Sequence, residues 1–226
     1  MMAIQSVEAF LPTNKEQLDC YENAWLERFD AVEGRDRLLQ DEEKRALDTL
    51  FDAAMKVEPP PRMRRYLDIG TCTGRYLGWA LERGFGGVYG LDRTQDAVML
   101  SRRKFDPRAR VIKANVLEDI TRMPVLERMD LVSIMFGTIN HFSDAQQRVL
   151  LRNSMRCMTE SGSVVISSWQ PGKCDFSLYD AEDRALLASR GLSINDLRAL
   201  GVACDLKLVD WTSTSSLVVA RFVRRT

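Results

Sequence analysis

The stretch Leu67–Leu77, "LDIGTCTGRYL", decides the fold of this chain. It begins as an apolar strand, passes through a turn that contains Gly70 and Gly74, and continues with helical spacing. At the carboxyl edge of a parallel sheet, such a junction offers backbone N–H groups and the positive end of a helix dipole to a ligand. We therefore predict a binding loop at this position.

Cys72 limits what this loop can hold. Gly70 allows a sharp turn and close approach to a ligand, and Gly74 keeps the helix start close to the strand. A nucleotide-binding turn usually has a middle glycine where Cys72 stands, and a side chain there hinders a pyrophosphate from lying flat on the backbone. We expect a smaller terminal group, such as an amino-acid carboxylate. The alternative is that the glycines only form a tight turn.

Short β-rich runs alternate with helical patterns from Arg65 onward. This alternation predicts a parallel sheet with helices on both faces. The last stretch, "CDLKLVDWTSTSSLVVARFV", contains two β-like runs joined by a Ser/Thr-rich turn, which predicts a closing antiparallel hairpin. The predicted parallel strands are "RYLDI", "GVYGL", "RVIKA", "DLVSIMF" and "SVVISSW".

Two helices are predicted before Pro59. Apolar residues recur at helical spacing between Leu18 and Phe29, and again between Leu39 and Ala54. The prolines of "EPPPR" end the second helix because they remove backbone donors. We expect residues 1–58 to form a helical cap and residues 59–226 an α/β domain, together one compact unit.

The composition excludes several classes of protein. The 226 residues are 45% apolar, which is enough for one sizeable core. The 32 basic residues balance 32 acidic ones, so the chain has no net positive charge that would favour binding to nucleic acid. The five cysteines are widely spaced and form no zinc-ligand pair, which indicates reduced thiols and no metal site. With no signal peptide or apolar span, we expect a cytoplasmic protein without a membrane partner, as a monomer or homodimer.

Polar residues follow the next two predicted strands. Asp92, next to Arg93, lies 22 residues after Gly70, close to the separation of about 20 at which a carboxylate accepts ribose hydroxyls. After the third strand, Asn115 could bond an adenine edge, and Val116 offers backbone and an apolar face. The alternatives are a solvated carboxylate at residue 92 and a turn asparagine at residue 115.

In this order, "LDIGTCTGRYL", "GLDRT", "ANVLED", "DLVSIMFGTINHF" and "SVVISSW" resemble the class I S-adenosylmethionine-dependent methyltransferases. The resemblance covers Arg64–Trp169 well and the closing hairpin more loosely. It implies a Rossmann-like, seven-stranded, mostly parallel sheet with its last strand antiparallel, helices on both faces and an N-terminal helical extension.

The same resemblance implies S-adenosyl-L-methionine as the cofactor. The first loop would hold its methionine end, the second strand end its ribose and the third its adenine. Two positions depart from the family pattern: Cys72 replaces the usual middle glycine, and Asn115 replaces a frequent acid. The implied cofactor-binding residues are Asp68, Gly70, Thr71, Cys72, Thr73, Gly74, Asp92, Arg93, Asn115 and Val116, with Phe136 facing the sulfonium.

The candidate catalytic residues follow the fourth and fifth strands. In "MFGTINHF", Asn140 could orient an amine or carbonyl, while His141, the only histidine, is either a general base or a structural hydrogen-bonding residue. Tyr179 lies where this fold often inserts a substrate lid. Tyr21 and Trp25 could fold over the site and offer aromatic faces to the cation, or simply pack their helix.

Three functions remain open at this stage. The first is methyl transfer to a small-molecule acceptor, favoured because motifs for large acceptors are missing. The second is cyclisation of S-adenosylmethionine itself, as in azetidine-2-carboxylate synthases, which look similar in scaffold and release methylthioadenosine. The third is a noncatalytic module that binds the cofactor.

Overall fold

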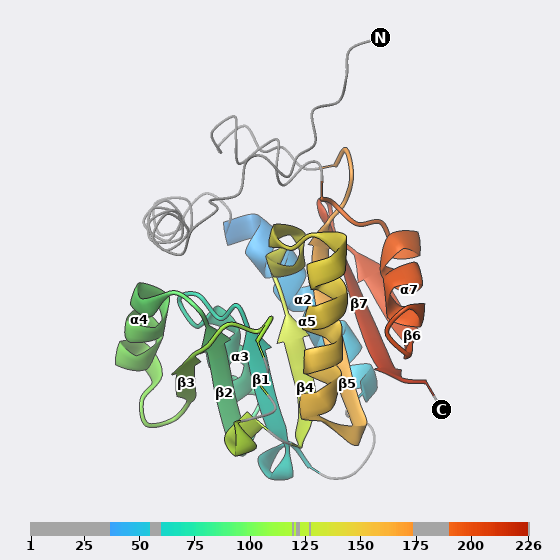
Figure 1. The fold of residues 1–226 in the computed structure, drawn as a ribbon. Helices are drawn as coiled ribbons and strands as arrows, with labels where there is room; N and C mark the ends of the chain where they lie inside the picture. Colours follow the sequence, from blue (N-terminus) through green and yellow to red (C-terminus); the bar gives the residue numbers. More distant parts are fainter. Residues whose placement is uncertain are drawn as a thin grey trace.

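The computed structural model describes residues 37–54, 60–118, 120, 123–126, 128–173 and 190–225. Within these ranges, seven strands form one sheet in the order β3-β2-β1-β4-β5-β7-β6 (Figure 1). The central strand β1 (Arg65–Ile69) pairs in parallel with β2 (Gly87–Asp92) and with β4 (Met129–Ile134). The predicted α/β class is thereby confirmed.

The strands towards the two edges of the sheet differ in direction. On one side, β3 (Arg110–Lys113) is a parallel edge strand. On the other, β5 (Met158–Trp169) runs parallel to β4, and the last strand β7 (Leu217–Arg224) runs antiparallel between β5 and β6 (Leu206–Ser213). The predicted closing hairpin is therefore present, with its last strand inserted inside the sheet.

Helices cover both faces of the sheet (Figure 1). One face is packed by α2 (Arg37–Ala54), α3 (Arg75–Glu82) and α4 (Gln95–Phe105), whose apolar residues share one core cluster. The other face is packed by α5 (Asp144–Cys157) and α7 (Ile194–Val202). Short 3-10 turns cover Pro61–Met63, Pro124–Leu126 and Thr138–His141.

Alternate side chains of β1 point to opposite cores. Tyr66 packs with α2 and α3, whereas Leu67 and Ile69 belong to the core under α5 and α7. Because both faces are covered, the central strands are apolar almost throughout. Asp68 interrupts this pattern, because it places a carboxyl group in the interior with only 1% of its surface exposed.

The N-terminal prediction is tested only in part. The second predicted helix corresponds to α2, in which Leu47, Leu50 and Phe51 are buried. The first predicted helix, with Tyr21 and Trp25, lies outside the described residues.

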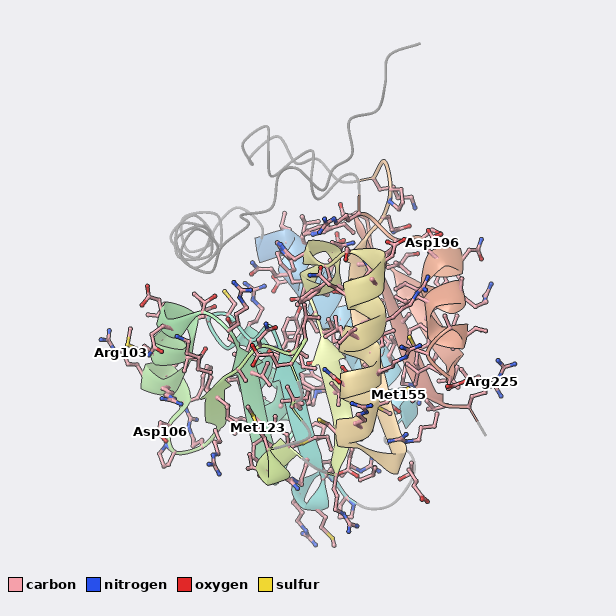
Figure 2. The ribbon with its side chains drawn as sticks, in the orientation of Figure 1. Arg103, Asp106, Met123, Met155, Asp196 and Arg225 are labelled. Carbon is pink, nitrogen blue, oxygen red and sulfur yellow. The ribbon has the colours of Figure 1, made fainter. Side chains whose placement is uncertain are left out.

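Charged side chains such as Arg103 and Asp196 are exposed on the outer surfaces of the helices (Figure 2).

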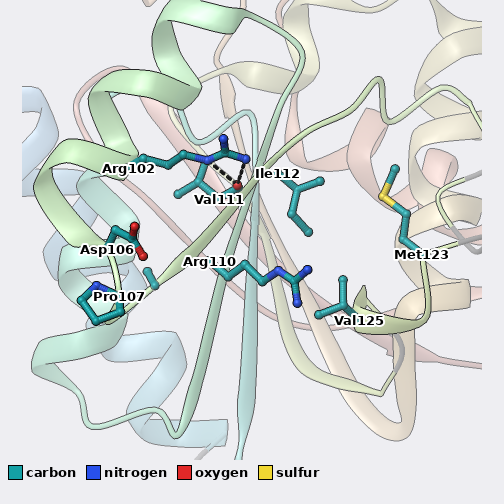
Figure 3. A pocket seen from close by; sticks show the side chains of 9 residues that line it. Arg102, Asp106, Pro107, Arg110, Val111, Ile112, Met123 and Val125 are labelled. Atoms are coloured by element: carbon teal, nitrogen blue, oxygen red, sulfur yellow. Dashed lines mark hydrogen bonds between the residues drawn. The ribbon is translucent and has the colours of Figure 1, made fainter.

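A cavity of about 760 Å³ lies at the amino end of β3 (Figure 3). Arg102 lines it and donates from Nε and Nη2 to the Val111 carbonyl, at 3.0 and 2.8 Å. The strand-end loops singled out in the sequence lie at the opposite, carboxyl edge of the sheet, so this cavity is separate from them. Its lining residues are Arg102, Asp106, Pro107, Ala109, Arg110, Val111, Ile112, Met123 and Val125.

Candidate active site at the carboxyl edge of the sheet

The loop after β1 is a tight turn fixed to the neighbouring strand. The N–H groups of Gly70 and Thr71 donate to the Leu91 carbonyl, at 2.8 and 3.2 Å. Gly70 has a φ of 73°, and a Cβ added there would lie 2.6 Å from the side chain of Thr138. Glycine is therefore required at this position by both conformation and space, because the first and fourth strand-end loops touch here.

Cys72 adopts a conformation that side chains rarely adopt. Its φ is 47°, in the left-handed region, which explains why glycine is usual at this position. Its N–H donates to Asp92 Oδ2 at 2.9 Å, and its carbonyl accepts from the Ser101 hydroxyl at 2.6 Å. The partly exposed thiol thus stands on a backbone that is hydrogen-bonded on both sides.

Asp92 ends β2 and connects two loops. Its Oδ1 accepts from the Thr94 N–H at 2.9 Å, while Oδ2 holds the Cys72 N–H. Burial raises the pKa of this carboxyl above its usual range, and the backbone donors oppose that rise. The side chain is partly exposed together with Arg93, so a hydroxyl donor can reach its oxygens. Asp92 can therefore accept hydroxyl groups while it supports the first loop.

The end of β3 presents one partly exposed polar side chain. Asn115 accepts from the Leu117 N–H through Oδ1 at 3.0 Å and leaves its amide donors available for another contact. The Val116 side chain is buried in the core, and the Val116 carbonyl accepts from Asn153 at 2.7 Å. The Val116 side chain is therefore not exposed to an adenine ring, and only the backbone part of the predicted contact remains a prediction.

The end of β4 places an aromatic ring next to the first loop. Phe136 and Gly137 are two successive left-handed residues, with φ values of 50° and 71°. The Phe136 ring lies 5.2 Å from the Arg75 guanidinium carbon and 5.2 Å, edge to face, from the Trp169 ring. Residues from α3, from the loop after β4 and from β5 thus form an aromatic and cationic cluster at one edge of the sheet.

Asn140 is completely buried and hydrogen-bonded to the protein. Its Nδ2 donates to the Ser168 hydroxyl at 2.9 Å and to the Arg190 carbonyl at 2.5 Å. Its Oδ1 accepts from the Trp169 N–H at 3.1 Å. The side chain therefore joins the β4 loop, the end of β5 and the segment at Arg190, and its predicted role toward substrate stays a prediction.

His141 lies next to Asn140 and is partly buried. Burial, together with the smaller effect of the positive charge of Arg190, lowers the pKa of its imidazole to about 4. The ring is therefore neutral at physiological pH and a weak base. Arg190 also donates to the His141 carbonyl at 3.0 Å, which fixes the backbone of this turn.

Three predicted site residues, Tyr21, Trp25 and Tyr179, lie outside the described residues. In the described part of the chain, no group of three or more His, Cys, Asp or Glu side chains is arranged to hold a metal ion. The same part contains no helix with the length and apolarity needed to cross a membrane.

Residues 67–162 match the family model described as "Methyltransferase domain". The chain carries a class I S-adenosylmethionine-dependent methyltransferase domain. The matched range begins in β1 and ends in β5, so it includes the four strand ends described above. No curated protein is detectably similar to this methyltransferase in sequence.

Solved structures are similar to this methyltransferase in fold. An S-adenosylmethionine-dependent methyltransferase from Clostridium acetobutylicum aligns over 92% of this chain and 100% of its own, with 12% identity and a TM-score of 0.67. A TehB-like methyltransferase from Corynebacterium glutamicum aligns over 86% and 97%, with 19% identity and a TM-score of 0.61. CalS10, an amino pentose methyltransferase from Micromonospora echinaspora, aligns over 82% and 92%, with 17% identity and a TM-score of 0.59.

The methyltransferase also has a buried polar layer beneath the site. Asp68 accepts from the Ser133 hydroxyl at 2.6 Å, and burial raises the pKa of this carboxyl to about 7. Glu43 on α2 is completely buried and accepts hydrogen bonds from Tyr76, Ser167 and the Phe136 N–H.

Sequence reasoning missed Glu43. The helical pattern contained a signal, because Glu43 stands on the same stripe as the buried Ala46, Leu47 and Leu50. An acid on the apolar stripe of a helix indicates a buried partner.

Proposed function

We propose that this protein transfers a methyl group from S-adenosylmethionine to a small-molecule acceptor. The observation that carries the proposal is that the β1 loop, Asp92 and the Phe136 ring meet at one edge of the sheet, linked by the Cys72–Asp92 hydrogen bond and the Gly70–Thr138 contact. The similar structure of CalS10, which acts on an amino pentose, supports a small acceptor.

The residues present fit the cofactor. Gly70 and the turn of Thr71, Cys72 and Thr73 form a cradle at the carboxyl end of β1, where Gly70 and Cys72 are partly exposed and Gly70 has no side chain to hinder a ligand. We assign this cradle, with Asp68 beneath it and Gly74 at the helix start, to the methionine end. Asp92 would accept the ribose hydroxyls, with Arg93 beside it, and Asn115 with the Val116 backbone would face the adenine.

The catalytic contribution of the chain is to position the two reactants. S-adenosylmethionine, when bound, supplies an activated methyl group on a sulfonium. Phe136 offers an aromatic face to a cation, and Trp169 packs against that ring. Asn140 bonds the Trp169 backbone N–H and so fixes the end of β5 beside this ring, which would help to hold the two reactants in line.

The products of one incubation test the proposal. Purified full-length protein is mixed with S-adenosylmethionine and a pool of small amines, phenols and carboxylic acids, and analysed by mass spectrometry. S-adenosylhomocysteine together with a methylated acceptor would support methyl transfer. Methylthioadenosine formed without any acceptor would instead support cyclisation of the cofactor, and binding of the cofactor without either product would support a noncatalytic module.

Cys72 is expected to be replaceable. Cys72→Gly removes a side chain from a left-handed residue, so the relief of strain offsets the greater flexibility of glycine. We expect the same products and a cofactor dissociation constant within about threefold of the wild-type value. Calorimetry and product analysis check this, and loss of turnover with retained binding would show that the thiol is chemically involved.

His141 is expected not to act as the base. Because the pKa of its imidazole is about 4, His141→Gln should lower turnover far less than the roughly 10²–10⁴-fold that general base catalysis contributes. The pH profile of turnover should keep its shape around neutrality. A large loss together with a flattened ascending limb would instead identify His141 as the base.

The same variant has a stability signature. The wild-type folded state binds fewer protons at His141 than the unfolded state, because burial lowers the folded pKa from 6.5 to about 4. Wild-type stability should therefore fall as the pH drops from 6.5 towards 4. His141→Gln should show a smaller fall, measured by chemical denaturation across this range.

A further inference from the structure

Helix α2 brings a buried carboxylate to the carboxyl edge of the sheet. Glu43 has an exposed fraction of 0%, although it is charged in water. Its Oε1 accepts from the Phe136 N–H at 2.7 Å and from the Ser167 hydroxyl, and its Oε2 accepts from the Tyr76 hydroxyl. One side chain of α2, which precedes the first strand in the sequence, thus bonds residues of α3, of the loop after β4 and of β5.

The backbone that Glu43 holds is strained. Phe136 is a bulky residue with a φ of 50°, and Gly137 follows with a φ of 71°. Such a conformation persists only where the surroundings hold it. The Gly137 N–H points to the Ser167 hydroxyl at 3.4 Å, and that hydroxyl donates to Glu43. Glu43 and Ser167 together therefore accept from both N–H groups of this left-handed pair.

Packing of α2 alone does not account for a glutamate at this position. Burial raises the pKa of the Glu43 carboxyl, and the three hydrogen bonds and the charge of Arg75 oppose that rise. Desolvating a carboxylate is unfavourable, and a buried apolar residue of similar volume often stabilises a fold as well or better. A carboxylate at residue 43 is explained by its hydrogen bonds to the turn that carries the Phe136 ring.

We propose that Glu43 is a positioning residue for methyl transfer. It fixes the Phe136–Gly137 turn, so that the Phe136 ring stays between Arg75 and Trp169 at the edge where the donor binds. This rests on the proposed function for its catalytic consequence. Its structural part concerns the protein alone and can be measured without cofactor.

Three variants and two measurements test the proposal on the full chain. Glu43→Ala removes both acceptors, whereas Glu43→Gln keeps Oε1 for Phe136 and Ser167 and places an amide opposite the Tyr76 hydroxyl, which can rotate to accept. Glu42→Gln is the matched control: Glu42 bonds the Ser215 N–H and hydroxyl at the β6–β7 turn, so this change removes the neighbouring carboxylate charge from α2 without touching Phe136. The first measurement is amide hydrogen exchange at Phe136 and Gly137 without cofactor. The second compares the change in turnover at saturating cofactor with the change in the cofactor dissociation constant.

In Glu43→Ala, both amides should exchange at least about tenfold faster. Turnover at saturating cofactor should fall by on the order of 10²-fold, because a shift of about 1 Å in a positioning group can cost that much. The cofactor dissociation constant should change much less than turnover. Glu43→Gln should rescue both amide protection and turnover, and the Glu42→Gln control should match the wild type.

Other results would overturn the proposal. If Glu43→Gln is as damaging as Glu43→Ala, the negative charge matters and not the hydrogen-bonded position. If exchange and turnover are unchanged in Glu43→Ala, Glu43 only packs α2. Should Glu43→Ala fail to fold, Ser167→Ala removes the second acceptor from β5, and unchanged exchange at Gly137 would then contradict the proposal. If the wild type forms no methylated product, the proposed function fails, while the exchange results still decide the role of Glu43.

Discussion

Replacing Asp92 with alanine is expected to weaken S-adenosylmethionine binding by about 1–3 kcal/mol, roughly 5-fold to 150-fold in the dissociation constant. Two losses act in the same direction. The ribose hydroxyls lose a charged acceptor, and the Cys72 and Thr94 N–H groups lose the carboxylate that fixes their loops at 2.9 Å each.

Calorimetric titration of the folded variant measures this effect. Asp92→Asn keeps one acceptor oxygen and should fall between the wild type and Asp92→Ala. Asp41→Ala, which removes an exposed carboxylate from α2, is the control for a change of net charge. An unchanged dissociation constant in folded Asp92→Ala would rule out the assignment of this residue to the ribose.

Replacing Asn140 with alanine is expected to lower turnover by on the order of 10²-fold, with a smaller effect on cofactor affinity. The amide joins Trp169, Ser168 and the Arg190 carbonyl, so its removal frees the end of β5 that supports the Phe136 ring. The buried Trp169 N–H loses its acceptor, which should lower the free energy of unfolding by about 1–3 kcal/mol.

Turnover at saturating cofactor, cofactor affinity and chemical denaturation separate these effects. All rates must be taken at a temperature well below the unfolding transition of the variant. Asn195→Ala, an exposed asparagine on α7, is the control. If Asn140→Ala loses stability but keeps its turnover, Asn140 is structural only and the positioning account fails at this residue.

The two proposed positioning residues, Glu43 and Asn140, each hold the backbone of one member of the Phe136–Trp169 ring pair. Glu43 holds the backbone at Phe136 from the α2 side, whereas Asn140 holds the end of β5 through Trp169. Because both act on the Phe136–Trp169 pair, the effects of Glu43→Ala and Asn140→Ala on turnover should not be additive in the double variant. This shared dependence follows from the contacts and not from the sequence motifs.

The sequence by itself determined the class of fold and the edge of the sheet at which we propose that the cofactor binds. Local hydrophobic period distinguishes strands from helices, and glycines at positions 70 and 74 mark a turn whose φ values are positive. The spacing from Gly70 to Asp92 indicated the second strand end, which lies beside the first because β1 and β2 pair in parallel. These features are local, or follow from the general rules for parallel sheets.

Only the tertiary structure decided which side chains hold the site together. Glu43 meets Phe136 across 93 residues of sequence and Ser167 across 124, and Asn140 meets Arg190 across 50. The pKa of His141 depends on burial and on Arg190, which no local pattern reveals. The physical reason is that hydrogen-bond partners and desolvation depend on distance in space, whereas periodicity and turn chemistry report only on neighbours along the chain.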